Sequence, residues 1–340
     1  MITNRLHHGT AIATNTMTRA KTNILSAKIL SGLLGFCVGD ALGVPVEFCS
    51  RSQLEEAPVR EMRGYGTHNR PTGTWSDESA VMFCVAEALS REDVTAEAFL
   101  NVTADRLVSW YEGEIWTLPD WDFEIGATTA KAIARLREGI SPRLSGDMDE
   151  MSNGNGSLVR TLPFVFCHHL LPFPDLLDRI HLISGITHAH PRSQMACGFY
   201  ISIAIALLQG CPPEEAYLQG IARVEPFYWH PPYSDRLFHF HNLIGGAIAE
   251  LPREEIASGG YVIHTLEAAL WCLLNASSYK ETVLAAVNLG ESTNAIAALA
   301  GGLAGLHYGV KDIPADWIQQ IAEFYKILAL CEQLTEKIFD

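Results

Sequence analysis

The stretch 284-LAAVNLGESTNAIAALAGGLAG-305 consists of two runs of small apolar residues separated by the polar sequence GESTN at positions 290–294. Apolar residues recur at helical spacing on both sides, so the stretch predicts two helices that are interrupted at this break. Ser292 or Thr293 can cap the second helix, with Asn294 in its first turn. The chain contains 39 Asp and Glu residues, yet the break holds a single carboxylate, that of Glu291.

Helical spacing continues through most of the 340 residues. No run of alternating residues indicates a sheet, and no charged or Ser/Gly-rich linker divides the chain. We therefore predict an all-α fold that forms one large domain from about residue 24 to residue 340, preceded by a disordered extension at residues 1–23. Met17 is an alternative start of the protein. The predicted helices span residues 78–92, 93–113, 129–139, 193–210, 262–276 and 314–339.

The composition restricts the classes of partner and compartment. A formal net charge of −15 disfavours nucleic-acid binding, which needs clustered Lys and Arg, although backbone N–H groups can still hold a small anion. The eight cysteines form no CxxC pair and most lie in apolar runs, which predicts buried free thiols in the reducing cytoplasm. We find no signal peptide and no clean apolar run of about 20 residues, so we expect no membrane span.

Two acidic stretches each allow a structural and a functional interpretation. In GFCVGDALGVPVEF, a glycine at every fourth position favours close helix packing, and Asp40 favours a capping role, with a polar cavity as the alternative. In TGTWSDESAVMF, Ser76 is a good N-cap, and the acids Asp77 and Glu78 suit the first turn of a helix. The same three residues can instead ligate a hard cation such as Mg²⁺ or Ca²⁺.

Two loops that contain glycine or histidine are candidate ligand sites. In 153-NGNGSLVR-160, two glycines flank Asn155 ahead of a predicted helix, whose free N–H groups and Arg160 suit a phosphate. Plain turns have the same composition, so this motif alone is weak. His188 and His190 lie two residues apart, but nothing nearby completes a zinc site.

In this order, the motifs resemble the ADP-ribosylglycohydrolase family, also called the dinitrogenase-reductase-activating-glycohydrolase family. The resemblance covers about residues 25–317. Seven matches in the family's order make it specific. They are GDALGVPVE (39–47), GTWSDESA (73–80), EIGATT (124–129), GNGSLVR (154–160), SGITH (184–188), GYVIHTLEAALW (260–271) and AVNLGESTNAIAALAG (286–301).

The resemblance implies a large orthogonal helical bundle with a cleft for two Mg²⁺ or Mn²⁺ ions. It also implies a hydrolase that removes ADP-ribose from a modified protein side chain or a related acceptor, by metal-assisted attack of water at the ribose anomeric carbon. By position, the implied catalytic residues are Glu47, Asp77 and Glu78, and the implied metal ligands are Ser76, Asp77, Glu78, Ser292 and Asn294. The implied substrate-binding residues are Gly126, Gly154, Asn155, Gly156, Ser157 and His188.

The chain departs from the family at the implied metal ligands. Where the family reads GGDTDT, this chain reads GESTNA at positions 290–295, so Ser292 and Asn294 replace two aspartates. Hard cations depend on carboxylates, and the replacement therefore lowers the metal affinity that we expect. Glu291 can substitute for one lost aspartate from one position upstream. We expect one or two ions that are weakly held or absent.

Two functional hypotheses remain. In the first, the chain is an ADP-ribosyl hydrolase in which Asp77, Glu78 and Glu291 position the attacking water. In the second, it is a degenerate member that binds ADP-ribose or a protein partner without hydrolysis. The sequence does not identify the acceptor. The candidates for stacking on adenine are the loop aromatics Trp121, Phe123 and Tyr228.

Overall fold

The computed structural model describes residues 4–119, 123 and 125–339, with side chains described from residue 23 onward. This part of the chain contains helices and three isolated β-bridges but no β-sheet, which confirms the all-α prediction. The α-helices are α1 (Asn4–Gly43), α2 (Arg51–Glu56), α3 (Asp77–Arg91), α4 (Ala98–Tyr111), α5 (Ala127–Arg137), α6 (Phe173–Gly185), α7 (Pro191–Leu208), α8 (Pro213–Val224), α9 (His241–Ile244), α10 (Val262–Leu274), α11 (Tyr279–Val287), α12 (Thr293–Tyr308), α13 (Ala315–Gln320) and α14 (Phe324–Phe339). Short 3-10 helices are η1 (Val44–Val46), η2 (Gly66–His68), η3 (Asn155–Arg160), η4 (Leu162–Cys167), η5 (Glu225–Tyr228), η6 (Ser234–Phe240), η7 (Ile248–Glu250), η8 (Arg253–Glu255) and η9 (Val310–Asp312).

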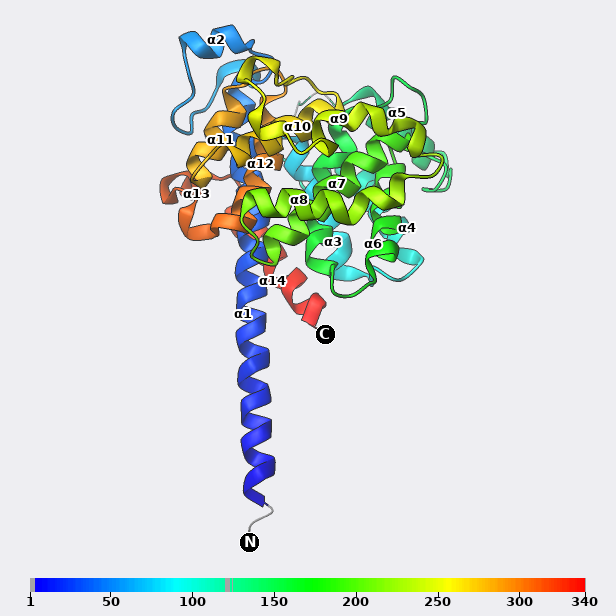
Figure 1. Ribbon diagram of the computed structural model, residues 1–340, viewed down its shortest axis with the longest axis vertical. Coiled ribbons are helices and arrows are strands. Elements are labelled where there is room, and N and C mark those ends of the chain that lie inside the picture. Colours follow the sequence, from blue (N-terminus) through cyan, green and yellow to red (C-terminus); the bar gives the residue numbers. More distant parts are fainter. Residues whose placement is uncertain (1–3, 120–122, 124, 340) are drawn as a thin grey trace.

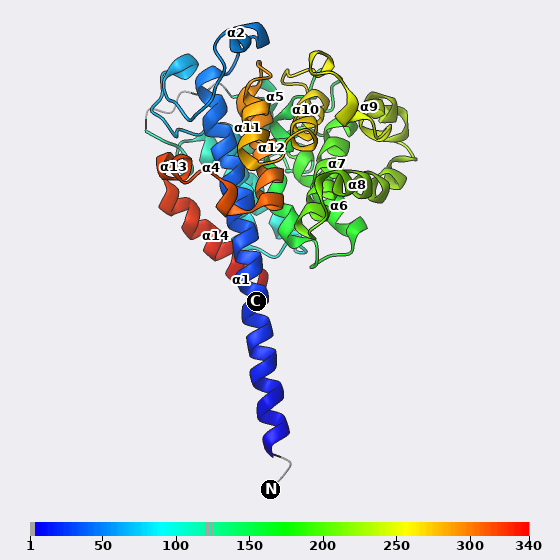
Figure 2. The same cartoon turned by 60° about the vertical axis from the view of Figure 1, so that its left-hand side comes forward.

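The paired helices α1 and α12 run through the centre of the fold (Figure 2). Their contact depends on the glycines of α1, because a β-carbon on Gly39 would lie 2.0 Å from the carbonyl oxygen of Ala297. A β-carbon on Gly35 would likewise lie 2.5 Å from the carbonyl oxygen of Gly301. The packing interpretation of these glycines is therefore confirmed, and it brings the end of α1 against the start of α12.

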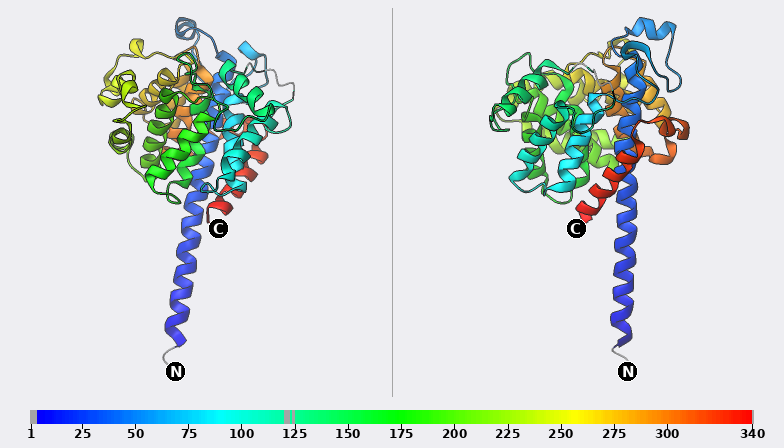
Figure 3. Two further views of the ribbon diagram at one scale, coloured as in Figure 1. Left: turned by 90° about the vertical axis from the view of Figure 1, so that its right-hand side faces the viewer. Right: turned by 180° about the vertical axis from the view of Figure 1, so that it is seen from behind.

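The remaining helices surround this central pair. Helix α14 lies against α1 and α3 on one side, while α7 and α10 contact α12 and α8 covers α7 (Figures 1 and 3). One connected set of buried apolar side chains extends from Ile29 to Ile338. Burial of each large apolar side chain contributes roughly 1.5–3 kcal/mol, so this core holds the helix ends at the site in fixed positions.

The first half of α1 projects away from the body (Figure 1). Helix α1 begins at Asn4, so no element starts at residue 24, and the predicted disorder of residues 1–23 stays a prediction. Within the described residues, the segment Asn23–Val46 is long and apolar enough to cross a membrane, with a hydropathy of 1.8, but 94% of its apolar 18-residue window is buried in the fold. A core helix has the same composition, and the expected absence of a membrane span stays a prediction.

Two further expectations can be compared with the structure. The single helix predicted at 314–339 is wrong: α13 and α14 are separate because the backbone N–H of Ala322 donates to the carbonyl of Gly73 and Trp75 Nε1 donates to the carbonyl of Ala322 (3.0 and 2.9 Å). Glu323 follows with a φ of 56°. All eight cysteines are free, as predicted, while the cytoplasmic location stays a prediction.

Candidate active site

The start of α3 is fixed by a buried carboxylate. The carboxylate of Asp40 accepts hydrogen bonds from the backbone N–H and hydroxyl of Ser76 (3.0 and 2.7 Å) and from the backbone N–H and hydroxyl of Ser79 (3.0 and 2.5 Å). Burial raises the pKa of Asp40 to about 6, and these hydrogen bonds oppose the rise. Asp40 thus has the capping role, and Ser76 is the N-cap of α3 as predicted.

The start of α12 lies directly across from the start of α3. Asn294 Nδ2 donates to Ser76 Oγ (3.3 Å), and the Thr293 hydroxyl donates to the carbonyl of Gly43 (2.8 Å). Ser292 is the N-cap residue of α12, as expected, but its side chain forms no capping hydrogen bond. Because α1 packs closely on α12, the Thr293 hydroxyl donates its hydrogen bond to the last residue of α1.

The predicted ligand loop approaches the same place from a third direction. Asn155 Nδ2 donates to Thr265 Oγ1 (3.2 Å) and to Ser292 Oγ (3.1 Å). The backbone N–H of Asn155 donates to the carbonyl of Gly260 (3.0 Å). Asn155 opens η3 rather than an α-helix. The loop is therefore tied both to the segment before α10 and to the segment before α12.

These segments enclose a cavity of about 370 Å³. It collects predicted site residues from six separate parts of the sequence. The predicted residues in its lining are Glu47, Asp77, Glu78, Gly126, Gly154, Asn155, Gly156, His188, Glu291 and Ser292. The lining also contains Phe48, Ala127, Thr128, Thr129, Met151, Gly259 and Gly260.

Three predicted site residues do not line the cavity. Ser76 and Asn294 lie buried behind the wall, joined by their mutual hydrogen bond. Ser157 is fully buried, where its hydroxyl accepts a hydrogen bond from Ser184 Oγ (3.0 Å) and lies 3.7 Å from Cys197 Sγ. The structure therefore brings Gly154, Asn155 and Gly156 to the cavity, and it directs Ser157 into the core.

The expectation that Arg160 adds charge to a phosphate site is wrong. Arg160 is fully buried and donates to the carbonyls of Gly156 (2.9 Å) and Ile183 (2.7 Å) and to Thr187 Oγ1 (2.8 Å). Burial lowers its pKa to about 10. Its guanidinium supports the ligand loop from beneath, because it ties that loop to the segment that carries His188.

His188 borders the glycine loop, whereas His190 lies elsewhere. The Nδ1 atom of His188 is 2.7 Å from Thr187 Oγ1, and burial lowers the pKa of His188 to about 3, so its ring is neutral. His190 accepts from the backbone N–H of Arg192 and contacts Glu150. The two histidines do not form a zinc site with each other.

The lining of the cavity contains two chemically different sets of residues, which we call its two walls. One contains the N-terminus of α5, which has no acidic residue in its first turn, and the glycines Gly154, Gly156, Gly259 and Gly260. The other contains the carboxylates of Glu47, Asp77, Glu78 and Glu291. Among the described lining residues there is no Lys or Arg. A ligand with an anionic and a cationic end matches this arrangement.

The carboxylates of the acidic wall lie close enough to repel one another. Burial raises the pKa of Asp77, and the negative charges of Glu47 and Asp40 raise it further. The pKa of Glu78 is raised by burial and by Asp77. Glu47 Oε2 lies 2.6 Å from His68 Nε2. A bound cation would relieve the repulsion within this wall.

A complete metal centre is nevertheless not assembled. In the described part of the chain, no three His, Cys, Asp or Glu side chains form a group that could hold a metal ion. The oxygen of Ser76 already takes part in hydrogen bonds with Asp40 and Asn294. The Oδ1 atom of Asn294 is buried without a partner, but Asn294 is absent from the cavity lining. The donors therefore do not fit a two-ion centre.

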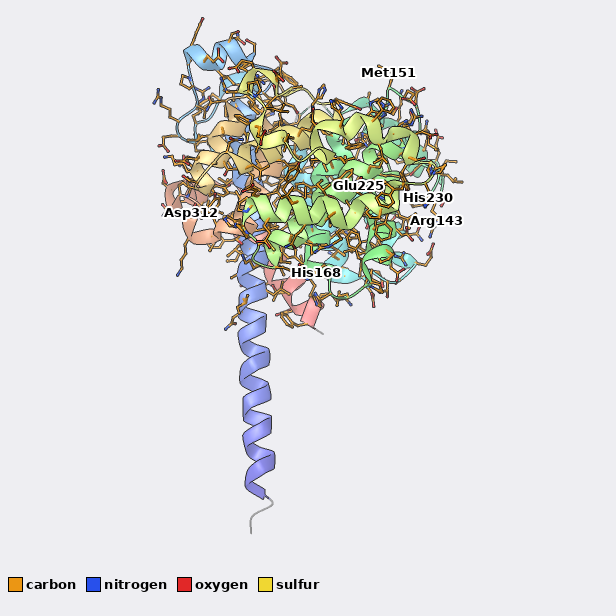
Figure 4. All side chains as sticks on the ribbon, in the orientation of Figure 1. Arg143, Met151, His168, Glu225, His230 and Asp312 are labelled. Carbon is orange, nitrogen blue, oxygen red and sulfur yellow. The ribbon has the colours of Figure 1, made fainter. Side chains whose placement is uncertain are left out.

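Sequence reasoning missed some lining residues and misjudged the aromatic candidates. Phe48 and Met151 are 63% and 91% exposed, and Met151 projects from the edge of the body (Figure 4). Ala127, Thr128 and Thr129 lie in the EIGATT motif and Gly260 opens GYVIHTLEAALW, whereas Met151 lies in no quoted motif. Tyr228 is fully buried away from the cavity, and Phe123 packs on His68 with ring centroids 4.9 Å apart. Trp121 lies outside the described residues.

Comparisons with known proteins place relatives of this chain among ADP-ribosyl hydrolases. ADP-ribosylarginine hydrolase Tri1 of Serratia proteamaculans (strain 568) is 31% identical over 314 residues, which cover 90% of this chain and 78% of that protein. ADP-ribosyl-(dinitrogen reductase) glycohydrolase of Rhodospirillum rubrum is 27% identical over 300 residues, covering 86% of this chain and 90% of that protein. A solved structure titled "ADP-ribosylglycohydrolase-related protein complex" superposes with a TM-score of 0.75 at 28% identity, covering 93% of this chain and 99% of that one.

The sequence profile of the ADP-ribosylglycohydrolase family matches residues 21–340. The match contains every helix that contributes to the cavity. Because the profile spans nearly the whole chain, and because a relative of 31% identity is covered over most of its length, this chain belongs to the ADP-ribosylglycohydrolase family.

Proposed function

We propose that this chain is a hydrolase that releases ADP-ribose from an ADP-ribosylated protein side chain. The supporting observation is that one cavity is lined both by backbone donors and by carboxylates. Its volume of about 370 Å³ lies within the range of small-molecule sites. ADP-ribose supplies a diphosphate for the first wall, and a cationic acceptor such as arginine suits the second.

The diphosphate binds at the N-terminus of α5 and along the glycines. The N–H groups of Ala127, Thr128 and Thr129 precede the first intrahelical donor, the N–H of Ala130, which reaches the carbonyl of Gly126. Such free N–H groups and the helix dipole attract phosphate. Open space surrounds the position of a β-carbon on Gly126, so the backbone is accessible.

The carboxylates act at the opposite end of the ribose. A water attacks the anomeric carbon as the bond from that carbon to the acceptor nitrogen breaks. The water loses one proton to a carboxylate, and the departing nitrogen takes up a proton. We assign proton acceptance to Glu47 Oε2, which His68 Nε2 holds at 2.6 Å, and water positioning to Asp77 and Glu78. Carboxylates placed here stabilise, in their ionised form, the positive charge that develops on the ribose.

We propose at most one weakly bound Mg²⁺ or Mn²⁺, at the carboxylates of Asp77 and Glu78. Two carboxylates are few for a hard cation, which normally takes six or more oxygens and completes its shell with water. When bound, the ion would add charge stabilisation at the ribose and orient water. The steps assigned above to the side chains do not require it.

The acceptor that we propose is arginine. Its guanidinium is cationic, which suits the carboxylate wall. The Serratia proteamaculans relative is named an ADP-ribosylarginine hydrolase, and so is a relative from Pseudomonas putida (strain GB-1) that is 30% identical over 308 residues. These names support the choice of substrate for the first assay.

The test is release of ADP-ribose from a peptide ADP-ribosylated on arginine, followed by chromatography. We expect turnover by the full chain and a loss of at least about 100-fold for Asp77→Asn, since removal of one key group commonly has that effect. The matched control is Asp105→Asn, at an exposed aspartate of α4. Turnover that is equal in both variants, or absent in the unmodified chain, would refute the proposal.

One observation favours a second function, which is binding of ADP-ribose without hydrolysis. The two residues that replace the family's aspartates both form hydrogen bonds within the protein, Ser292 with Asn155 and Asn294 with Ser76. The cavity is thus held together without cations. Calorimetric binding of ADP-ribose in EDTA, together with absent turnover, would establish this second function in place of the first.

A further inference from the structure

Two strained residues meet at the mouth of the cavity. Phe48 and Glu291 have φ values of 65° and 60°, although both carry a β-carbon that disfavours this left-handed region. Two backbone hydrogen bonds of 2.8 Å join the two segments. The N–H of Phe48 donates to the carbonyl of Glu291, and the N–H of Glu291 donates to the carbonyl of Cys49. Strain of this kind persists where the surrounding structure enforces it, and it gathers at functional sites.

Hydrogen bonds and close backbone contacts hold the residues next to Phe48 and Glu291 in place. Arg51 Nε donates to the carbonyl of Leu289 (3.0 Å), and Arg51 Nη1 donates to the carbonyl of Arg253 (2.6 Å). Gly290, next to Glu291, has a φ of 85°, and a β-carbon there would lie 2.7 Å from the backbone nitrogen of Arg51. The turn before α12 is therefore fitted closely to the residues that follow Phe48.

The strained backbone presents two side chains to the cavity. The Phe48 ring is 63% exposed, the Glu291 side chain is also exposed, and both line the cavity. Phe is normally buried, so an exposed ring on strained backbone is not explained by core packing. The ring of His68 lies 6.1 Å away from that of Phe48 between centroids, which leaves the Phe48 ring partly covered on one side.

We propose that Phe48 and Glu291 form the subsite that recognises the guanidinium of the arginine acceptor. A guanidinium is flat and weakly hydrated, so it stacks on aromatic faces and pairs with a carboxylate at the same time. An ammonium stacks less well, and a hydroxyl gains neither contact. This inference rests on the proposed function and assigns acceptor specificity to two residues outside the ribose and diphosphate sites.

Charge within the cavity supports this assignment. The described lining residues include four carboxylates and no Lys or Arg, so an anionic acceptor would be repelled. Glu47, Asp77 and Glu78 already serve the ribose end in the proposed function. Glu291 is the remaining carboxylate of the lining, and its backbone is bonded to that of the exposed aromatic residue Phe48.

The experiment compares the affinities of three probes for the full chain that carries Asp77→Asn, in which substrate is not turned over. The probes are free ADP-ribose, a peptide ADP-ribosylated on arginine, and the same peptide with an ADP-ribosylated serine. Calorimetry is expected to show the arginine-linked peptide binding about tenfold more tightly than ADP-ribose, as a partly exposed cation–π contact combined with one carboxylate pair provides. The serine-linked peptide should match ADP-ribose.

Adding Phe48→Ala or Glu291→Gln should each remove most of this gain and leave the affinity for ADP-ribose unchanged, whereas Phe48→Tyr should retain it. The matched controls are Phe238→Ala, at a ring of 66% exposure outside the cavity, and Glu254→Gln, at an exposed acid. Both controls should keep the full gain. Equal affinity of the two peptides, or a gain that survives both substitutions, overturns the inference.

The same data separate this inference from the proposed function. If the arginine gain depends on Phe48 and Glu291 but the unsubstituted chain shows no turnover, the subsite is supported and the hydrolase proposal fails. If the chain turns over both peptides equally well and binds them equally, the hydrolase stands and the subsite is overturned. If ADP-ribose and both peptides fail to bind, both proposals fail.

Discussion

Asn294 Nδ2 donates to Ser76 Oγ over 3.3 Å, which joins two helix starts that are 218 residues apart in the chain. The same Ser76 hydroxyl donates to Asp40 Oδ1 over 2.7 Å. The contact between α3 and α12 is therefore neutral and needs no cation. One atom stays unsatisfied, since Asn294 Oδ1 is buried without a partner, at a typical cost of ~1–3 kcal/mol.

Asn294→Asp should convert this neutral contact into a cation-dependent one. A new carboxylate would be buried beside Asp40 and Asp77, so we expect the free energy of unfolding in EDTA to fall by ~1–3 kcal/mol. Added Mn²⁺ should restore the loss, because a third carboxylate raises the affinity for a hard cation. Thermal unfolding with and without Mn²⁺, and calorimetric titration of Mn²⁺, measure the two effects.

The control for this change is Asn101→Asp, the same substitution at an exposed position of α4. It should alter neither unfolding nor Mn²⁺ affinity. An Asn294→Asp variant that binds Mn²⁺ no better than the unmodified chain would contradict this prediction and show that residue 294 does not reach an ion.

Gly39→Ala should destabilise the protein and damage the site together. The new β-carbon would meet the Ala297 carbonyl oxygen at 2.0 Å, and backbone cannot move aside as a side chain can. Separation of α1 from α12 also disturbs the contact of Gly43 with Asn294. We expect a loss of several kcal/mol, at or above the ~1–3 kcal/mol typical of overpacking, measured by urea unfolding.

Gly185→Ala is the appropriate comparison. Its β-carbon would lie 3.7 Å from Gln194 Nε2, which is an ordinary contact. Its effect should therefore stay within about 1 kcal/mol. Similar losses in both variants would argue against close packing of α1 and α12 as the determinant of the fold.

The sequence predicted the fold class and the meeting of α3 with α12 because both have local signatures. The glycines spaced by four indicate the surface of α1 that packs on another helix, and Ser76 indicates where a helix starts. The polar residues before α12 likewise indicated that two helices are separated there. Ordered motifs then implied which segments share a cavity, and nine of the implied residues line it, together with Glu291.

Other features depend on tertiary contacts that leave no local pattern. Arg160 follows a glycine loop, yet it is buried because carbonyls of residues far along the chain collect around its guanidinium. The break between α13 and α14 depends on hydrogen bonds of Ala322 with Gly73 and Trp75, which periodicity cannot reveal. The exposure of Phe48 follows from a backbone φ of 65°, a property that no propensity indicates for Phe.

The contribution of His181 to stability should fall as the pH drops below about 6.5. Its ring nitrogens lie 3.0 Å from the hydroxyls of Tyr228 and Tyr233, and burial lowers its pKa to about 3. Between these two values the unfolded chain binds a proton that the folded chain does not, so acid favours unfolding. At about pH 5 the loss is roughly 2 kcal/mol relative to about pH 7.

His188 has a pKa lowered in the same direction, so His181→Gln should remove about half of the combined dependence of these two residues. Urea unfolding at about pH 7 and about pH 5 measures the slope. His230→Gln, at an exposed histidine visible at the edge of the body in Figure 4, should leave it unchanged. A His181→Gln variant with the original pH slope would contradict the assignment to His181.

The bond between Asn155 and Ser292 should couple the ligand loop to the turn before α12. Asn155→Ala removes donors to Ser292 and Thr265, so the loop loses its orientation, and we expect ADP-ribose to bind roughly tenfold more weakly, equivalent to ~1.4 kcal/mol. Ser292→Ala should weaken binding less, because Asn155 keeps its bond to Thr265. Calorimetry on both variants and on the double variant gives the coupling energy.

The double-variant measurement separates positioning from direct contact with the ligand. If Ser292 acts by holding Asn155, its substitution has little further effect once Asn155 is gone, and the two effects fail to add by ~0.5 kcal/mol or more. If the two residues contact ADP-ribose independently, the effects add. Asn155→Ala combined with Asn101→Asp should be additive, because Asn101 lies on α4 outside the cavity lining. Additivity in the Asn155–Ser292 pair would therefore contradict a positioning role for Ser292 and leave its hydroxyl as a direct ligand contact.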